Sequence, residues 1–183
     1  MKCKYSSLPF IILLLIEVAC ICSGCASISA KKPSAEPGNP AAELSEYVRQ
    51  GKVDELSLTI HYMNPHLLTR MPVSEEYLIE RWYEIKVTVS GELLEKHIDL
   101  VDQVAKAAFT PVKQESYVNA RLYYVFESKD HRKIFSVCMW SGDSKSIVNG
   151  IEVQNNDILY DVVMPFLPDD AAEELKTFMD TTK

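Results

Sequence analysis

The sequence predicts an α+β domain, built on an antiparallel sheet of about five strands with helices packed on one face. Three observations predict it: runs in which apolar and polar residues alternate, an Asn-Gly pair between two apolar residues, and stretches with apolar residues every three or four positions. The 183 residues are 47% hydrophobic and 25% charged, which is the composition of a globular protein.

Alternating residues predict two strands in the first half of the chain. Residues 56–62 alternate between apolar and polar side chains, as a half-buried strand does, and Pro65 follows them. The same alternation runs over 85–89 and stops at Gly91. Both stretches are therefore expected to place one face on the core.

Two hairpins are predicted in the second half. Residues 122–126 alternate and residues 134–140 are nearly all apolar, with a polar turn over 128–131 between them. Asn149 and Gly150 form the pair that a type I′ turn favours, since both of its central positions need a positive φ. The segments on either side of each turn are expected to pair antiparallel.

Helices are predicted from their ends and from their periodicity. Asn39 is a favourable N-cap and Gly51 lies just past the last helical residue, so a helix is expected over 40–50. Ser74 precedes two glutamates that suit a helix N-terminus, which predicts a helix over 75–82. Apolar residues at steps of three and four predict the longest helix, over 93–108. Two short helices are expected near 157–164 and 170–180, the second with Asp170 and Glu173 in the manner of a capping box.

The first 24 residues have the pattern of an export signal. Lys2 and Lys4 precede an apolar run over 8–16, and Glu17 interrupts it. The run is shorter than the roughly 20 apolar residues that a helix needs to span a bilayer. We therefore expect a cleaved signal peptide over 1–24 rather than a permanent membrane span.

Four residues at the end of this segment resemble a known motif. Cys22, Ser23, Gly24 and Cys25 resemble the lipobox of bacterial lipoproteins, with Cys22 where leucine is usual. The resemblance implies that the Cys25 thiol takes a diacylglycerol and that the signal is removed before Cys25. It also implies that acyl chains such as palmitate hold the protein at a membrane of the cell envelope, on its non-cytoplasmic side. More than one acyl chain is what stable anchoring requires.

Two other processing sites stay open. Cys20 is an earlier candidate for lipidation, in which Glu17 occupies the position that prefers leucine. Cleavage after Ala26 by the ordinary signal peptidase would instead release a soluble protein. The choice between inner and outer membrane stays open as well.

The exported chain is predicted to consist of a tether and one domain. Residues 25–39 are rich in Ser, Ala, Lys and Pro and hold almost nothing to bury, so a lipid-anchored flexible tether is expected there. About 14 such residues reach at most about 50 Å. Residues 40–183 have the length of a single domain, which is the predicted α+β domain.

Short motifs for catalysis or cofactor binding are missing from the sequence. It has no nucleophile elbow, zinc-protease motif, phosphate loop or EF-hand. His61 and His66 have no third residue at ligand spacing, so no metal site is predicted. Cys138 lies in an apolar stretch and is expected to be an inert buried thiol. We therefore expect no cofactor and no enzymatic activity.

The charge and the aromatic residues bear on the partner. With 19 basic and 26 acidic residues the net charge is −7, which disfavours a nucleic-acid partner. Eight aromatic residues are expected to fill the core of the sheet rather than to line a binding groove. They are Tyr62, Trp82, Tyr83, Tyr123, Tyr124, Phe126, Phe135 and Trp140.

Export, a tether and the missing catalytic motifs favour a binding module at the cell envelope. Its partner would be an envelope protein or a small ligand, and the membrane would be reached through the lipid alone. Two alternatives stay open. An envelope hydrolase can assemble a dispersed active site from distant segments, and a secreted inhibitor or immunity-type protein would follow from cleavage after Ala26.

Overall fold

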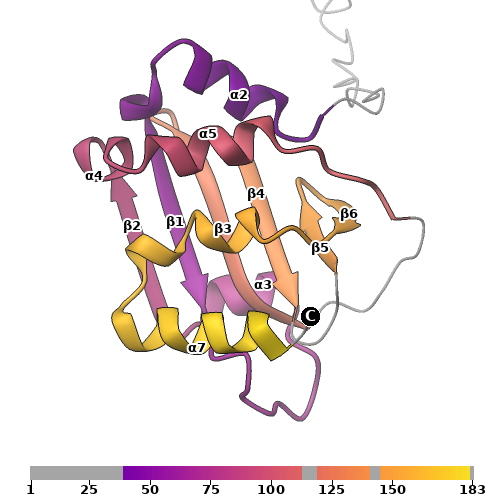
Figure 1. The fold of residues 1–183 in the computed structure, drawn as a ribbon. Helices are drawn as coiled ribbons and strands as arrows, with labels where there is room; N and C mark the ends of the chain where they lie inside the picture. Colours follow the sequence, from indigo (N-terminus) through magenta and orange to yellow (C-terminus); the bar gives the residue numbers. More distant parts are fainter. Residues whose placement is uncertain (1–38, 113–118, 141–144, 182–183) are drawn as a thin grey trace, which may run out of the picture. The chain divides into compact units, whose positions relative to one another are not determined.

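The structure, a computed structural model, describes residues 39–112, 119–140 and 145–181. These ranges hold six strands: β1 (Leu56–Tyr62), β2 (Ile85–Ser90), β3 (Ala120–Ser128), β4 (Lys133–Trp140), β5 (Lys145–Val148) and β6 (Ile151–Gln154). They form one antiparallel sheet in the order β2-β1-β3-β4-β5-β6 (Figure 1). The predicted α+β class is confirmed, with six strands instead of about five.

The two predicted hairpins are present. β3 pairs with β4, and β5 pairs with β6 through a turn in which Asn149 and Gly150 have φ of 49° and 79°. These are the positive values that a type I′ turn needs. The Asn149 side chain also accepts from the Ser136 backbone N–H at 2.8 Å and donates to the Pro40 carbonyl oxygen at 2.7 Å. The turn therefore ties the start of the domain to the sheet.

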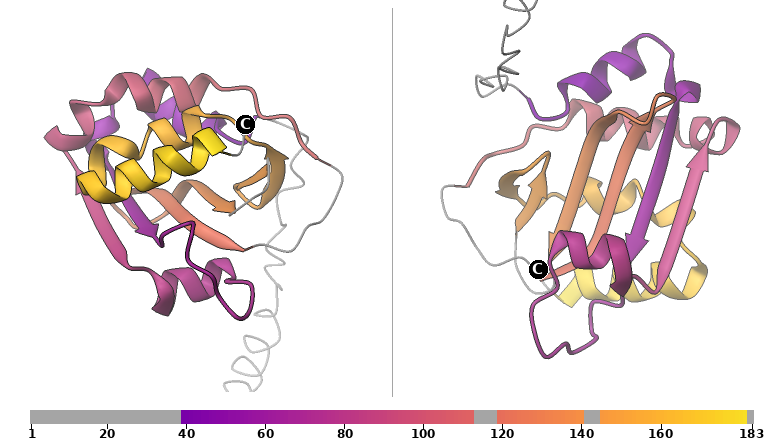
Figure 2. Two further views of the ribbon diagram at one scale, coloured as in Figure 1. Left: turned by 60° about the horizontal axis from the view of Figure 1, so that its bottom comes forward. Right: turned by 180° about the vertical axis from the view of Figure 1, so that it is seen from behind.

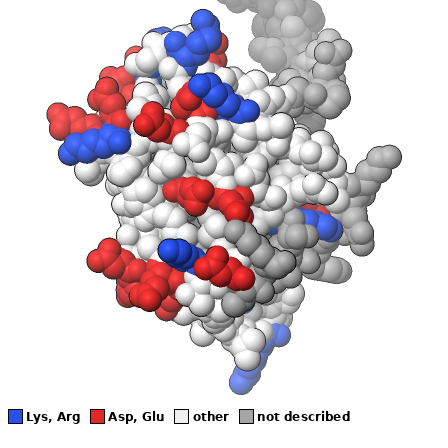
Figure 3. All heavy atoms as spheres, in the orientation of Figure 1, with Lys and Arg blue, Asp and Glu red and all other residues white. Residues whose placement is uncertain are grey.

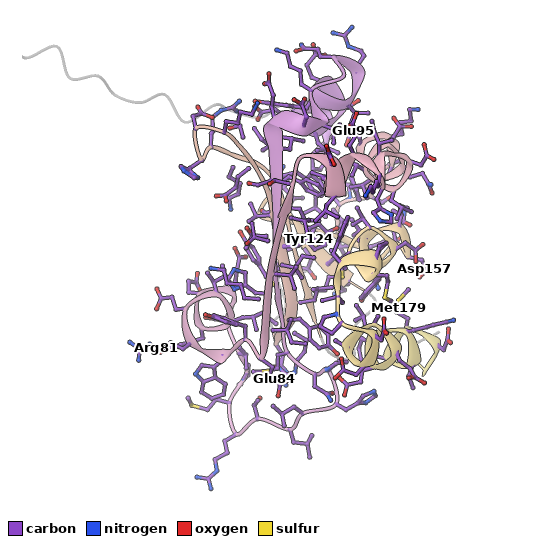
Figure 4. The ribbon with its side chains drawn as sticks, turned by 90° about the vertical axis from the view of Figure 1, so that its left-hand side faces the viewer. Arg81, Glu84, Glu95, Tyr124, Asp157 and Met179 are labelled. Atoms are coloured by element: carbon purple, nitrogen blue, oxygen red, sulfur yellow. The ribbon has the colours of Figure 1, made fainter. Side chains whose placement is uncertain are left out.

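Most helices pack around a main core on one face of the sheet (Figure 1). They are α2 (Ala42–Arg49), α4 (Glu92–Glu95), α5 (Ile98–Lys106), α6 (Ile158–Asp161) and α7 (Asp169–Thr181), with the short turns η1 (Val53–Glu55) and η3 (Met164–Phe166). Leu58, Tyr124 and Phe126 are fully buried in this core. Tyr124 points from the sheet toward these helices (Figure 4).

A short helical segment covers the opposite face. It consists of α3 (Glu75–Tyr77) and the π-helical turn η2 (Leu78–Trp82), and it lies behind the sheet (Figure 2). The cover has a physical reason, because β3 and β4 are apolar on both faces. A second cluster fills this side: Met63, Val73, Leu78, Ala120, Tyr123, Val125 and Cys138. The Cys138 thiol is buried as predicted, and burial raises its pKa.

The single helix predicted over 93–108 is two helices. His97 separates α4 from α5 with a non-helical backbone, φ −115° and ψ 25°. On either side of the break, Leu94 in α4 and Val101 in α5 are both fully buried. The His97 ring packs edge-on against Phe166, with 5.0 Å between ring centroids. Within the described ranges the longest helix is α7, with 13 residues.

The other helix predictions agree with the structure to within a few residues. The segment expected over 40–50 forms α2, and the Asn39 side-chain oxygen accepts from the Ala41 backbone N–H at 3.0 Å. The segment expected over 75–82 forms α3 and η2, with Ser74 as its N-cap. The two C-terminal segments form α6 with η3, and α7.

Candidate functional site

Residues 63–84 form the long connection between β1 and β2. Its two ends are adjacent, because Tyr62 and Ile85 are paired across the two strands. Between them the chain runs through a loop and then through α3 and η2 behind the sheet. Figures 1 and 2 place this connection at the end of the sheet opposite α2.

The connection carries most of the exposed apolar side chains of the domain. Among the described residues, six of the eight large hydrophobic side chains that are exposed lie between positions 67 and 83. Leu68 is 96% exposed, Met71 66% and Trp82 42%. Clustered exposure of this kind marks interaction sites in soluble domains. The six residues are called the apolar surface below: Leu67, Leu68, Met71, Tyr77, Trp82 and Tyr83.

Part of the apolar surface is concave. A pocket of about 200 Å³ is lined by Met71, Pro72, Val73, Tyr77 and Trp82. Sites for whole small-molecule ligands usually enclose roughly 300–1,000 Å³. This pocket is therefore sized for one protruding side chain, and its lining suits an apolar one.

A buried arginine holds the loop in position. Arg121 on β3 is 4% exposed, and its guanidinium donates to the Leu67 carbonyl oxygen at 2.9 Å and to the Asn119 side-chain oxygen at 2.7 Å. The Thr69 hydroxyl lies 3.4 Å from the same guanidinium. Burial lowers the pKa of Arg121 and the charge of Glu84 raises it, but an arginine stays protonated in either case.

Further hydrogen bonds fix both ends of the loop. At its start, the Asn64 backbone N–H donates to the Glu84 carboxylate at 2.8 Å, and the His66 backbone N–H donates to the Asn64 side chain at 2.8 Å. At its end, the Val73 backbone N–H donates to Asn119 at 3.1 Å. These hydrogen bonds, together with the buried Val73 side chain, give the loop a defined form while Leu68 and Met71 stay exposed.

The helical segment presents aromatic side chains beside the loop. Ser74 caps it, since its hydroxyl accepts from the Tyr77 backbone N–H at 3.2 Å. Leu78 is fully buried in the second cluster and anchors the segment, while Tyr77 and Trp82 stay exposed. A π-helical turn such as η2 is rare and is often found at functional sites.

His61 lies beneath the apolar surface. Its side chain is 4% exposed, and its ring meets the ring of Tyr83 edge-on with 5.1 Å between centroids. The Tyr123 ring lies at 6.0 Å. Burial, together with the charge of Lys86 on β2, lowers the pKa of His61 to about 4. The ring is therefore neutral at pH 7 and supports Tyr83 by packing.

Charged side chains of both signs border the apolar surface. Arg70 and Arg81 are exposed, and so are Glu76, Glu80 and Glu84. Figure 4 shows Arg81 projecting away from the sheet. These five charged residues, called the rim below, lie beside the apolar side chains along the chain, and polar rims are usual at protein interfaces.

A second hollow lies between α6 and α7. It encloses about 740 Å³ and is lined by Asp157, Asp161, Met164, Ala172, Glu173, Lys176, Met179 and Asp180. Figure 3 shows acidic side chains over these two helices. No group of three potential metal ligands occurs in the part of the chain that the structure describes. Because solvated carboxylates alone define no ligand, we do not assign a site to this hollow.

The eight aromatic residues expected in the core differ in where the structure places them. Trp82 and Tyr83 are exposed on the apolar surface, because they lie at the end of η2 and directly after it, outside every strand. For Trp140 the structure describes only the backbone at the end of β4. The other five are buried as predicted: Tyr62, Tyr123, Tyr124, Phe126 and Phe135.

The residues predicted for lipid attachment are not covered by the structure. Cys25 and the alternatives Cys20 and Ala26 lie outside the described residues. Among the helices of the described ranges, none combines the length and the apolar character needed to cross a membrane.

Comparison with protein-family models, with curated proteins and with solved structures finds no match to this chain.

Proposed function

We propose that this protein is an exported, lipid-anchored protein of the bacterial cell envelope that binds another protein through the apolar surface. The lipid on Cys25 holds it at the membrane, and residues 25–39 tether the domain. Binding, rather than catalysis, is the activity of the domain in this proposal.

The exposure of the apolar surface supports this proposal most directly. Each Å² of apolar area left in water forgoes about 25 cal/mol of stabilisation. Here the exposed side chains Leu68 and Met71 sit on a loop that a buried arginine and several side-chain hydrogen bonds fix in place. Folding alone gives no reason to hold apolar side chains outward on a fixed loop, whereas a partner that covers them does.

The position of the surface favours a protein partner over the membrane. The described domain begins at Asn39, at the α2 end of the sheet, and the apolar surface lies at the other end (Figure 1). A domain tethered through Asn39 can therefore keep this surface away from the bilayer to which it is anchored. The net charge of −7 and the exposed Glu76 and Glu80 also disfavour anionic lipid headgroups.

Replacing Cys25 by alanine is expected to release the protein from the membrane, because the substitution removes the thiol that takes the lipid. The measurement is the mass of the N-terminal peptide of the mature chain, from membrane and soluble fractions. Wild type should begin at Cys25 with a diacylglycerol, and Cys20→Ala should behave like wild type. An unmodified wild-type chain that begins after Ala26 would contradict the anchor and favour a secreted protein.

A photo-crosslinking residue tests the binding surface. Benzoylphenylalanine in place of Leu68, in the full chain in living cells, is expected to give a protein adduct on illumination. The control places it at Leu93, which is also exposed but lies on α4. Adducts with lipid alone, or equal yields of the same protein adducts at both positions, would contradict a protein-binding role for the apolar surface.

A further inference from the structure

We propose that the partner of the apolar surface is a second copy of this chain, with Leu68 of each copy seated in the pocket of the other. The contact is isologous, which means that both copies use the same surface. This inference rests on the proposed function, since it names the partner of the same surface.

The surface has both of the shapes that such a contact needs. In an isologous dimer a projection on one copy must meet a recess on the other, and both must lie on one patch. Leu68 is the projection, being 96% exposed. The recess is the pocket of about 200 Å³ between Met71 and Trp82, only a few residues along the chain. A leucine side chain is apolar and small enough for it.

The rim of the surface is also complementary to itself. Arg70 and Arg81 supply positive charge, while Glu76 and Glu80 supply negative charge. A rim that carries both signs offers opposite charges to a second copy of itself, whereas a rim of a single sign would repel its own copy. A rim of mixed sign is poorly suited to an anionic bilayer, which attracts mainly positive charge.

The construction of the loop and the membrane anchor both lower the cost of association. Arg121 and Asn119 already hold the loop through hydrogen bonds to Leu67 and Val73, so little conformational freedom is lost on binding. Lipid anchoring confines the copies to one membrane and so raises their effective concentration. A surface of modest size is therefore sufficient for pairing on the membrane.

Two variants, each with a rim of a single charge sign, test the pairing. One full-length lipidated chain carries R70E and R81E, and a second chain with a different epitope tag carries E76R and E80R. Both carry benzoylphenylalanine at position 68. The readout is the yield of adduct that contains both tags. The reference is a pair of differently tagged chains that keep the wild-type residues at positions 70, 76, 80 and 81. Thermal unfolding of each variant checks that it is folded.

Pairs of like variants should lose about tenfold or more in yield, because like charges then face each other, and the mixed pair should recover it. The adduct should map to the pocket, between Met71 and Trp82. A mixed pair no better than the like pairs would overturn self-association.

Adducts that join position 68 only to a different protein would overturn self-association and leave the proposed function standing. The absence of any protein adduct at position 68 would overturn both. Adduct formation with the wild-type rim does not depend on the folding of the charge variants, so the test is decisive even if one of them fails to fold.

Discussion

Replacing Arg121 by methionine is expected to lower the free energy of unfolding by about 2 kcal/mol and to release the loop that carries Leu68. Methionine fills much of the same volume but donates no hydrogen bond. The Leu67 carbonyl oxygen and the Asn119 side chain would then lose a charged donor, and bonds to charged groups contribute about 1.5–3 kcal/mol each. Removal of a buried charge offsets part of this loss.

Chemical denaturation gives the change in stability, and amide hydrogen exchange locates it. The backbone N–H groups of His66 and Val73, which donate to side chains at the two ends of the loop, should exchange faster in the variant. Arg70→Met is the matched control, because Arg70 is exposed on the same loop and its loss should change stability by no more than about 0.5 kcal/mol. Unchanged amide hydrogen exchange of the loop residues in the Arg121 variant would contradict the role assigned to this residue.

The domain is expected to lose about 3 kcal/mol of stability between pH 6.5 and pH 4 through His61. The pKa of this histidine is about 4 in the folded chain and about 6.5 when it is unfolded. Between these values the unfolded chain binds a proton that the folded chain does not, so stability falls as the pH falls. Each unit of difference corresponds to about 1.4 kcal/mol, and the loss is complete below pH 4.

His61→Phe should remove this loss, because phenylalanine keeps an aromatic ring against Tyr83 and Tyr123 and takes no proton. The measurement is denaturation midpoint against pH for both chains, and the difference between the two curves isolates His61 from the carboxylates. His66→Phe serves as the control, because it makes the same replacement at an exposed position. Parallel curves for wild type and His61→Phe would contradict the burial of a neutral His61.

The sheet was predictable because its signals are local. Alternation over 56–62 and 85–89 and the turn pair at Asn149 and Gly150 are properties of neighbouring residues, and they correspond to β1, β2 and the β5–β6 turn. The break at His97 was not predictable in this way. Apolar spacing continues across it, and the break becomes evident only in the folded chain, where α4 packs beside β2 and α5 packs beside α2 and α6.

The apolar surface was harder to predict for a related reason. Trp82 and Tyr83 are large aromatic residues of the kind that often fill a core. The neighbouring sequence does not distinguish an aromatic side chain that is buried from one that lies on the surface. His61 presents the opposite case, since alternation places it on the polar face of its strand. Its burial follows from α3 and η2 folding back over that face, which brings Tyr83 onto its ring.

The pairing of Tyr62 with Ile85 bears on how this protein can change over evolution. The two strands meet directly, so their register does not depend on the length or sequence of the residues between them. Substitutions and insertions in 63–84 are tolerable as long as Val73 and Leu78 still cover the second cluster. The exposed residues of the apolar surface can therefore diverge between lineages while the sheet stays constant.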